Sequence, residues 1–522
     1  MWTDSRAVGW TQSTNAGARL LLDQVLADPL GQVSCSIYES SRLVALAPWL
    51  PGHQARIDLL RRAQRPDGGW GGPDGYAVVT TLSATTALLA ELDRTPDDPY
   101  GLRPLVTGGL SALGRWLSPA TSPQVPDTIG CEVTIPALLA ELTGRLGPDA
   151  PPLRLPVGMD ERALAAMRGR FAAGALPQKT WACLEVIGPA AAGAAFIQPA
   201  LGAVGCSAAA TAAWLGSPAG DRSAYEFLDR LQARGGGAVP GVNPITYFEP
   251  AWVLNYLALG GFDLPVPTGL LDRLASGLAA DGAPAAPGLP ADADDTAAVL
   301  AALLRHGRVR RPDCLLDYRR GDYFTCFLDE RNPSISSNAH VLEALALYLD
   351  RRPTEQSRYA GPAALAAQWL LGQQAADGSW VDKWHASAYY ATACCAVALR
   401  LARETVSGSP AGAAEAIARA VTWVVDTQRE DGSWGRWQGT VEETSYAVHL
   451  LAVAAAADQP GVAEALRRGT RYLADPPRPA EDPPLWHAKE LYAPTQVIRA
   501  AHLAALRLGQ LHSAPVPSRP GD

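Results

Sequence analysis

Apolar residues recur along this chain at helical spacing, in alanine- and leucine-rich runs that often begin near Ser, Thr or Asn and end at glycine or proline. This pattern is typical of amphipathic helices, whereas the alternating pattern of strands is scarce. The sequence therefore predicts an all-α fold. The clearest expected helices cover residues 81–92, 295–305, 338–349, 390–402 and 443–457.

A loop motif of the form Gln-x-x-Asp-Gly-x-Trp occurs three times, at residues 64–70, 374–380 and 428–434. The last two copies start 54 residues apart, about the length of two helices with their loops. Asp-Gly suits a tight turn, and Trp offers a large ring with one N–H donor. We interpret the motif as structural, fastening neighbouring helical hairpins within two helical barrels or arrays.

An acidic motif holds three carboxylates, Asp292, Asp294 and Asp295, at the start of the helix expected near residue 295. A Pro/Gly-rich passage, 281–290, precedes it as a domain join or active-site loop. Because Asp is a favoured N-cap and negative charge is favoured in the first helical turn, the motif can be read as a simple cap. However, mutual repulsion and burial raise the pKa of at least one clustered carboxyl group. The second interpretation is therefore a proton donor, that is, a carboxylic acid that stays protonated near neutral pH.

Composition narrows the class of protein. The chain has 522 residues, 48% hydrophobic, with a net charge of −8, which predicts two or three domains and argues against a nucleic-acid partner. Neither a signal-peptide layout nor an apolar run long enough to span a bilayer occurs, so we expect a cytoplasmic protein without membrane insertion. The eight cysteines form no CxxC pair, which predicts reduced, buried thiols.

Lysine is rare, with three among 44 basic residues. A GC-rich genome is one explanation. The other is that an ammonium group enclosed by aromatic side chains suits an anionic ligand such as a phosphate. The lysines, with their nearby aromatic residues, are Lys179 (Trp181), Lys383 (Trp384) and Lys489 (Tyr492).

Two acidic residues of the first half, Glu39 and especially Glu132, are candidates to hold Mg²⁺. Mg²⁺ is usually bound by one or two carboxylates together with phosphate oxygens, so such an ion would bridge the protein and a diphosphate.

In combination these residues resemble the class II terpene cyclases. Asp292-Ala293-Asp294-Asp295-Thr296 resembles their DxDD(T) signature, and the three repeated loops resemble their QW motifs. The stretch 129–139 is similar to the segment of plant copalyl diphosphate synthases whose Mg²⁺/diphosphate glutamate would here be Glu132. The resemblance implies two α-helical double-barrel domains. Residues 1–24 and 282–510 would form the β domain with the DxDD motif, residues 25–281 an inserted γ domain, and residues 511–522 a disordered tail.

The resemblance also implies a mechanism. Asp294 would be the general acid that protonates the terminal alkene of a linear prenyl diphosphate, which keeps its diphosphate. Asp292 and Asp295 would tune the proton, and Asn338 would orient the acid by a hydrogen bond. The residues expected around the substrate are the three lysines and the aromatic side chains Trp181, Tyr247, Trp384, Tyr389, Tyr390 and Tyr492.

Geranylgeranyl diphosphate (C20), giving a copalyl-, labdane- or clerodane-type product, is the expected substrate. Farnesyl diphosphate (C15), giving a drimenyl-type product, is the alternative. One feature departs from the plant ent-copalyl enzymes, because Ala182 and Gly241 occupy the positions of their terminating His and Asn. Another base is therefore expected, either His385, His340 or a water held by a tyrosine or by Asn243.

Other classes fit less of the sequence. A squalene- or hopene-type cyclase shares both motifs but is longer and acts on a substrate without phosphate. A non-catalytic helical-barrel interaction protein would leave the acidic motif unexplained, and a protein prenyltransferase subunit would need a zinc site for which no residue set is apparent. Since neither a DDxxD nor an NSE motif occurs, a separate class I terpene synthase would act downstream. The chain itself is expected to be a monomer or a homodimer.

Overall fold

The computed structural model describes residues 4–513 apart from 119–120, 122–123, 148–151, 331, 457–458 and 476–481. Within these ranges the regular structure is helical except for two short antiparallel hairpins, so the predicted all-α class is confirmed. The hairpins pair β1 (Arg319–Arg320) with β2 (Tyr323–Phe324), and β3 (Trp486–His487) with β4 (Leu491–Tyr492).

The C-terminal helices form a closed ring. Six inner helices contact one another in sequence order, and the last returns to the first. They are α10 (Phe248–Leu259), α12 (Ala293–Arg305), α13 (Ile335–Arg351), α15 (Ala388–Thr405), α17 (Val441–Ala454) and α19 (Thr495–Ser513). The helices packed outside this ring are α1 (Asp4–Ala27), α11 (Thr268–Gly277), α14 (Gln356–Gly372), α16 (Ala413–Asp426) and α18 (Val462–Ala474), with the short segments η3 (Asp313–Tyr318) and η4 (Pro353–Glu355).

A second ring is built from the N-terminal half. Its inner members are α2 (Ile37–Leu46), α4 (Ala77–Arg94), α6 (Cys131–Leu146), the kinked 3₁₀ segment η2 (Gln178–Ala191) and α8 (Ala208–Leu215), which again contact one another cyclically. Outside them lie α3 (His53–Ala63), α5 (Arg103–Trp116), α7 (Arg162–Ala172) and α9 (Arg222–Arg234). The predicted arrangement of two helical double barrels is therefore confirmed.

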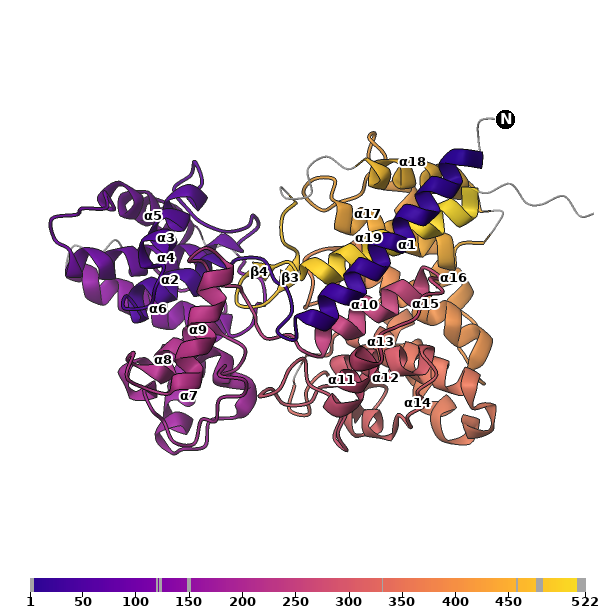
Figure 1. The fold of residues 1–522 in the computed structure, drawn as a ribbon, viewed down its shortest axis with the longest axis horizontal. Coiled ribbons are helices and arrows are strands. Elements are labelled where there is room, and N and C mark those ends of the chain that lie inside the picture. Colours follow the sequence, from indigo (N-terminus) through magenta and orange to yellow (C-terminus); the bar gives the residue numbers. More distant parts are fainter. Residues whose placement is uncertain are drawn as a thin grey trace, which may run out of the picture.

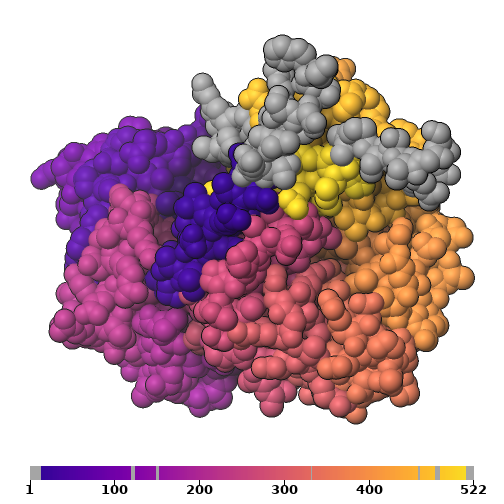
Figure 2. Space-filling model, turned by 45° about the vertical axis from the view of Figure 1, so that its right-hand side comes forward, coloured from indigo at the N-terminus to yellow at the C-terminus, as the bar shows by residue number. Residues whose placement is uncertain are grey.

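Figure 1 shows the two rings side by side, with the β3–β4 hairpin between them. Although α1 begins the chain, it packs against α19, α10 and α11 of the C-terminal ring. Figure 2 shows α1, in indigo, on the outer surface beside the pink and yellow segments of that ring.

One predicted boundary is wrong. Residues up to 281 were assigned to the inserted unit, but α10 is an inner helix of the C-terminal ring and α11 packs on it. Leu254 and Leu270 are fully buried in the same core as Leu300 of α12, so hydrophobic burial places both helices there. The division into β and γ domains otherwise stays a prediction. The predicted tail begins inside α19, which extends to Ser513, and its remainder lies outside the described residues.

The repeated loops fasten outer helices to one another, as predicted. In the second copy, Gln374 Nε2 donates to Gly378 O (2.8 Å) within the loop and to Ala416 O (2.9 Å) of the next outer helix. Trp380, fully buried, donates its indole N–H to Leu370 O of the preceding helix (2.8 Å). Gly378 has φ +97° and a Cβ there would lie 2.7 Å from Arg419 O, so this position requires glycine. The other two copies repeat these bonds, through Gln64 to Gly68 and Leu105, Trp70 to Leu60, Gln428 to Gly432 and Ala465, and Trp434 to Val424.

The eight cysteines are free thiols, and six of them are buried as predicted, whereas Cys35 is exposed and Cys394 is partly buried. No helix within the described ranges combines the length and apolar character needed to cross a bilayer.

Candidate active site

The acidic motif forms the N-terminus of α12. Asp292 is the N-cap, and its Oδ1 accepts the backbone N–H of Asp295 at 2.8 Å. Ala293 N donates to Cys326 O (2.9 Å), which fixes the entry of the chain into the helix. The motif is therefore a helix cap, as the first interpretation predicted. It also brings the three carboxyl groups together, which the second interpretation, a proton donor, requires.

The three carboxyl groups differ in how deeply they are buried. It raises the pKa of Asp292 to about 7, and burial followed by the charge of Asp292 raises the pKa of Asp295 well above its usual range. Oδ1 of Asp295 is buried without a hydrogen-bond partner. Asp294, in contrast, keeps 16% of its side chain exposed. At neutral pH this cluster therefore retains protons, and Asp294 is its most accessible member.

His340, not Asn338, contacts Asp294. His340 Nδ1 lies 2.7 Å from Asp294 Oδ1. Asn338 is fully occupied elsewhere, because its Oδ1 accepts Phe324 N (2.8 Å) while its Nδ2 donates to Phe324 O (2.8 Å) and Ser334 O (2.7 Å). The prediction that Asn338 orients the acid is wrong, since Asn338 instead holds strand β2 against α13.

The His340–Asp294 contact is an ion pair. Burial is the largest single influence and disfavours the charged imidazole, but Asp294 and Cys394 together outweigh it and raise the pKa of His340 well above its usual range. The pair thus places a protonated imidazole beside Asp294 Oδ1. A carboxylate stabilised in this way is a good product of proton donation by Asp294.

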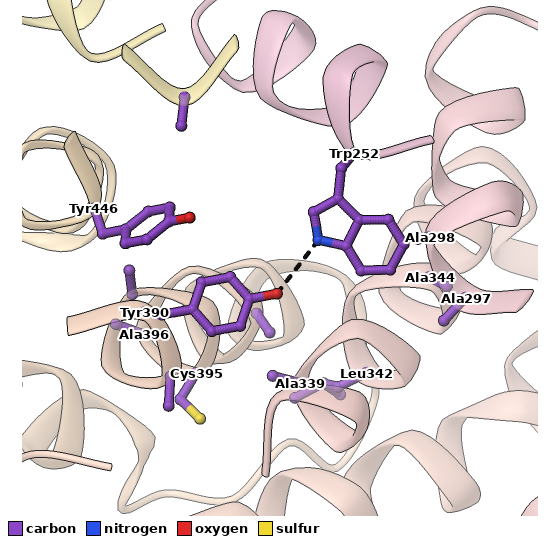
Figure 3. Packing of buried hydrophobic residues seen from close by; sticks show 14 of the residues in the cluster. Trp252, Ala297, Ala298, Ala339, Leu342, Ala344, Tyr390, Cys395, Ala396 and Tyr446 are labelled. Atoms are coloured by element: carbon purple, nitrogen blue, oxygen red, sulfur yellow. Dashed lines mark hydrogen bonds between the residues drawn. The ribbon is translucent and has the colours of Figure 1, made fainter. Parts of the chain in front are cut away.

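Aromatic rings continue from this pair across the interior of the C-terminal ring. Trp252 meets the His340 ring edge-on, with centroids 5.5 Å apart, and donates its indole N–H to Tyr390 Oη at 3.3 Å. Figure 3 shows Trp252, Tyr390 and Tyr446 directed toward a common space, with small side chains such as Ala297 and Ala339 nearby. Faces of this kind stabilise a carbocation through the ring quadrupole.

A cavity lies inside the ring next to these residues, with about 60 Å³ open to the centre of a water-sized sphere. Arg305 closes the polar end, donating to Asn255 Oδ1 (2.7 Å) and Glu343 Oε1 (2.6 Å). The residues that line the cavity come from α10, α12, α13, α15 and α17 and include Trp252, Tyr256, Leu259, Ala297, Ala298, His340, Ala393, Cys394, Val397, Tyr446 and His449.

A second buried carboxylate, Glu442, lies beside the aromatic rings. Its Oε1 accepts from Trp486 Nε1 (2.7 Å), Tyr446 Oη (2.9 Å) and His385 Nε2 (3.1 Å). The backbone N–H of Ser387 donates to His385 Nδ1 (3.0 Å), so the ring proton of His385 is on Nε2. All three donors reach Oε1, which leaves Oε2 outside these bonds.

The aromatic residues predicted around the substrate divide into two groups. Tyr390 is in the aromatic interior, and Tyr492 lies near the acid, since burial followed by the charges of Asp295, Glu442 and Asp294 raises its pKa. Tyr389 instead packs against Trp423 in a tilted arrangement, with ring centroids 4.6 Å apart, and Trp181 donates to Leu176 O within the core of the N-terminal ring. The last two are packed core rings rather than parts of this interior.

The two remaining aromatic candidates sit on loops. Tyr247 precedes α10, where its ring lies against Gly277 and its backbone N–H donates to Ala285 O (2.9 Å). Trp384 has a buried indole N–H without a partner, and the ammonium of Lys383 lies 5.1 Å from its ring centroid.

The three lysines occupy different environments. Lys383 forms an ion pair with Glu330 and donates to Asn332 O (2.6 Å). Lys489 is buried between Glu39 and Glu185 and is not available to a ligand, which argues against its predicted role in diphosphate binding. Lys179 is exposed, and no ion pair joins it to another described residue.

Lys179 is also next to the seam between the rings. The neighbouring Gln178 donates to Gly288 O (3.0 Å), in the loop that leads into the acidic motif. The Pro/Gly-rich passage 281–290 therefore contacts the N-terminal ring, in agreement with its interpretation as a join or active-site loop.

Glu132 is exposed in the first turn of α6. Burial, then the charges of Glu132 and Asp127, raise the pKa of Cys131 to about 12, which places both carboxylates near this thiol. Glu39, the other predicted Mg²⁺ ligand, is instead an acceptor for Ser207 and Ala209 inside the N-terminal ring. Among the described residues no group of three or more His, Cys, Asp or Glu side chains is placed to hold a metal ion. Glu132 and Asp127 would supply exposed carboxylate oxygens to a Mg²⁺ bound together with a diphosphate.

The candidates for the terminating base are mostly committed to other bonds. His340 pairs with Asp294, and Asn243 donates to the carbonyls of Leu30 (3.0 Å) and Gly31 (3.2 Å). Both ring nitrogens of His385 are used. Gly241, one of the two departures from the plant pattern, lies against Tyr492, because a Cβ built there would meet Tyr492 Cβ at 3.4 Å.

Sequence reasoning missed the roles of Trp252, His340 as the partner of the acid, and Glu442. A signal existed for Glu442, because Glu442 and Tyr446 are four residues apart at the start of a predicted helix and so share one face. For Trp252 and His340 the partners are distant in sequence.

Comparison with known proteins agrees with this geometry. The family model of the squalene-hopene cyclase C-terminal domain matches residues 323–490. The ent-copalyl diphosphate synthase of Streptomyces sp. (strain KO-3988) is 44% identical over 95% of this chain and 96% of its own length. The labda-7,13-dienyl diphosphate synthase of Streptomyces clavuligerus is 39% identical over 98% and 96%. The structure of ent-copalyl diphosphate synthase from Streptomyces platensis superposes with a TM-score of 0.89 at 47% identity, covering 95% of this chain and 99% of that one.

Proposed function

This chain belongs to the class II terpene cyclases of the bacterial copalyl and labdadienyl diphosphate synthase group, and we propose that it converts geranylgeranyl diphosphate to a copalyl-type bicyclic diphosphate. The observation that carries the proposal is the His340–Asp294 pair at the mouth of an aromatic-lined interior. The C20 substrate is favoured over farnesyl diphosphate because the relatives named above make C20 diphosphates.

Catalysis begins at Asp294. Its carboxylic acid gives a proton to the terminal alkene of the substrate, and the imidazolium of His340 stabilises the carboxylate that remains. Asp292 and Asp295, whose raised pKa values keep protons in the cluster, limit the negative charge beside the developing cation. The C–O bond to diphosphate is not broken.

Ring closure proceeds among the aromatic side chains. Trp252, Tyr390 and Tyr446 present their rings to the tertiary cations and exclude water from them. We assign the final proton removal to Glu442, because it is a buried carboxylate among these rings and its Oε2 is outside the three bonds that fix it. A proton next to a tertiary cation is so acidic that a weakly basic carboxylate suffices.

We assign the diphosphate end of the substrate to the seam between the two rings. Lys179 supplies an exposed ammonium there, and Glu132 with Asp127 would hold the Mg²⁺ that neutralises the diphosphate. A Mg²⁺ held there would contribute to substrate capture, whereas the proton for the alkene comes from Asp294. Since the product retains its diphosphate, a separate class I terpene synthase would consume it. A cytoplasmic location, and a monomeric or homodimeric state, stay predictions.

Incubation of the purified protein with geranylgeranyl and farnesyl diphosphate in parallel tests the proposal. The alcohols obtained after dephosphorylation are identified. A bicyclic C20 alcohol from geranylgeranyl diphosphate supports it, whereas turnover of farnesyl diphosphate alone would contradict it.

A further inference from the structure

A short segment of the C-terminal ring crosses to the N-terminal ring. The β3–β4 hairpin lies between the two rings (Figure 1). Its tip residues Lys489 and Glu490 are both buried. Ile129 N of the N-terminal ring donates to Ala488 O at 2.9 Å. The tip is therefore part of the interior of the other ring.

The ammonium group of Lys489 has three partners inside the N-terminal ring. Its Nζ lies 2.8 Å from Glu39 Oε1, 2.6 Å from Glu185 Oε1 and 2.8 Å from Ser207 Oγ. Of the three N–H donors of an ammonium group, two are hydrogen-bonded to Glu185 and Ser207, and the Glu39 carboxylate is held as an ion pair. Burial and these three partners leave Lys489 closed to a diphosphate oxygen.

The acceptors come from three different elements of the N-terminal ring. Glu39 is in α2, Glu185 is in η2, and Ser207 is the N-cap of α8. Glu39 also accepts the backbone N–H of Ala209 at 2.6 Å. Lys489 thus joins the hairpin to the point where these elements meet.

Glu490 adds a second attachment. Its Oε1 accepts Ser36 Oγ and the backbone N–H of Tyr38 (3.1 Å), both at the start of α2. Lys489 and Glu490, which are adjacent in the chain, thus attach the tip at two points.

The two legs of the same hairpin carry residues of the reaction chamber. Trp486 donates to Glu442 Oε1, and its ring centroid lies 4.9 Å from that of Tyr390. Tyr492 lies close enough to Asp294 and Asp295 that their charges contribute to its raised pKa. Any shift of the tip moves these two rings relative to the acid.

We propose that Lys489 is a positioning residue, which sets the geometry of Trp486 and Tyr492 by anchoring the β3–β4 hairpin in the Glu39–Glu185–Ser207 site. This inference rests on the proposed function. Under this proposal, the contacts of Lys489 with Glu39, Glu185 and Ser207 determine how the cation is guided and which proton is lost. They do not determine the affinity for the substrate.

The test compares Lys489→Met with Lys489→Arg and with Lys179→Ala. We expect Lys489→Met to lower kcat at least tenfold and to increase side products by at least fivefold, with KM for geranylgeranyl diphosphate within twofold. Lys489→Arg should recover most of the product fidelity. Lys179→Ala should do the reverse, raising KM with an unchanged product profile.

Removing Lys489 leaves two buried carboxylates unpaired, which destabilises a fold. The double variant Lys489→Met/Glu185→Gln removes one charge of each sign and serves where the single variant does not fold. Backbone hydrogen exchange of the segment 485–493 is measured in parallel. We expect faster exchange in this segment alone, in Lys489→Met and in the double variant.

A tenfold rise in KM with wild-type products and wild-type exchange would overturn the proposal and return Lys489 to diphosphate binding. Wild-type kcat and products in a folded variant would overturn it as well. Failure of the proposed function has a different signature, since the wild-type protein would then be inactive while the exchange of the hairpin would still depend on Lys489.

Discussion

His340 Nδ1 lies 2.7 Å from Asp294 Oδ1, joining two inner helices of the C-terminal ring across 46 residues of sequence. The contact places a positive charge directly behind the most accessible carboxyl group of the acidic motif. Its chemical consequence is that donation of a proton by Asp294 ends in a stabilised ion pair rather than in an isolated buried carboxylate.

Replacing His340 by Gln should lower kcat at least tenfold, because the charge that stabilises the Asp294 carboxylate is lost. The pH dependence of stability has a defined sign. Since the folded state raises the pKa of His340 above the ordinary value near 6.5, its stabilisation is complete below about pH 6.5 and is lost as pH rises through the folded pKa. The difference in unfolding free energy between wild type and His340→Gln should therefore shrink on going from pH 6 to alkaline pH. A difference that grows with pH would contradict the ion pair.

Replacing Asn338 by Ala should destabilise the fold by about 2–4 kcal/mol, because it removes three bonds from buried backbone groups of Phe324 and Ser334. The folded fraction should keep kcat within about threefold of wild type. Denaturant unfolding with activity measured per folded molecule separates the two effects. A selective loss of kcat without loss of stability would restore Asn338 as the partner of the acid.

The contrast between Asn338 and His340 shows where sequence reasoning stops. The helix that carries both was predicted correctly, but two residues separated by one position point about 200° apart on a helix. Which of them faces Asp294 depends on the rotation of α13 against α12, and tertiary packing decides that. The sequence therefore predicted the correct helix for the partner of Asp294, but the wrong residue on that helix.

The repeated loops were predictable because their chemistry is local. Gln374 donates to Gly378 O within the loop and Trp380 donates to Leu370 O of the helix just before it, in addition to the bond from Gln374 to Ala416 O of the next outer helix. Lys489 is the opposite case, since its acceptor Glu185 is 304 residues away in sequence. Its aromatic neighbours led us to predict an anionic ligand for Lys489, but a buried ion pair places a lysine in similar surroundings, and no local sequence pattern distinguishes the two.

Replacing Asp292 by Asn should flatten the pH dependence of stability between about pH 4 and pH 7. Asn keeps the N-cap acceptor for Asp295 N. The folded state raises the pKa of Asp292 from 3.8 to about 7, so its contribution is complete below pH 3.8 and is lost as pH rises toward 7. The unfolding free energy of wild type relative to the variant should fall by up to about 4 kcal/mol over this interval. Parallel slopes for the two proteins would contradict the burial of this carboxyl group.

Replacing Glu442 by Gln should change the products more than the substrate affinity. The amide can still accept the bonds from Trp486 and Tyr446 but cannot take up a proton. We expect a larger share of double-bond isomers or water-quenched products, with KM within twofold. The neighbouring Glu443→Gln, which removes a carboxylate that bonds to Thr440 and Arg436 N, is the matched control. If Glu442→Gln gives the wild-type product alone at the wild-type rate, the final proton goes to another group.

The central claim is that Asp294 starts the reaction by protonating the far alkene while the diphosphate stays attached. Turnover of geranylgeranyl diphosphate in D₂O, with the position of deuterium in the product and the pyrophosphate released both measured, tests it most directly. We predict one deuterium on the ring carbon next to the carbon that bears the two methyl groups, no pyrophosphate release, and loss of at least a hundredfold in rate in Asp294→Asn, with Asp322→Asn as an exposed control. Pyrophosphate released in step with turnover, or a product without solvent deuterium at that carbon, would contradict the account.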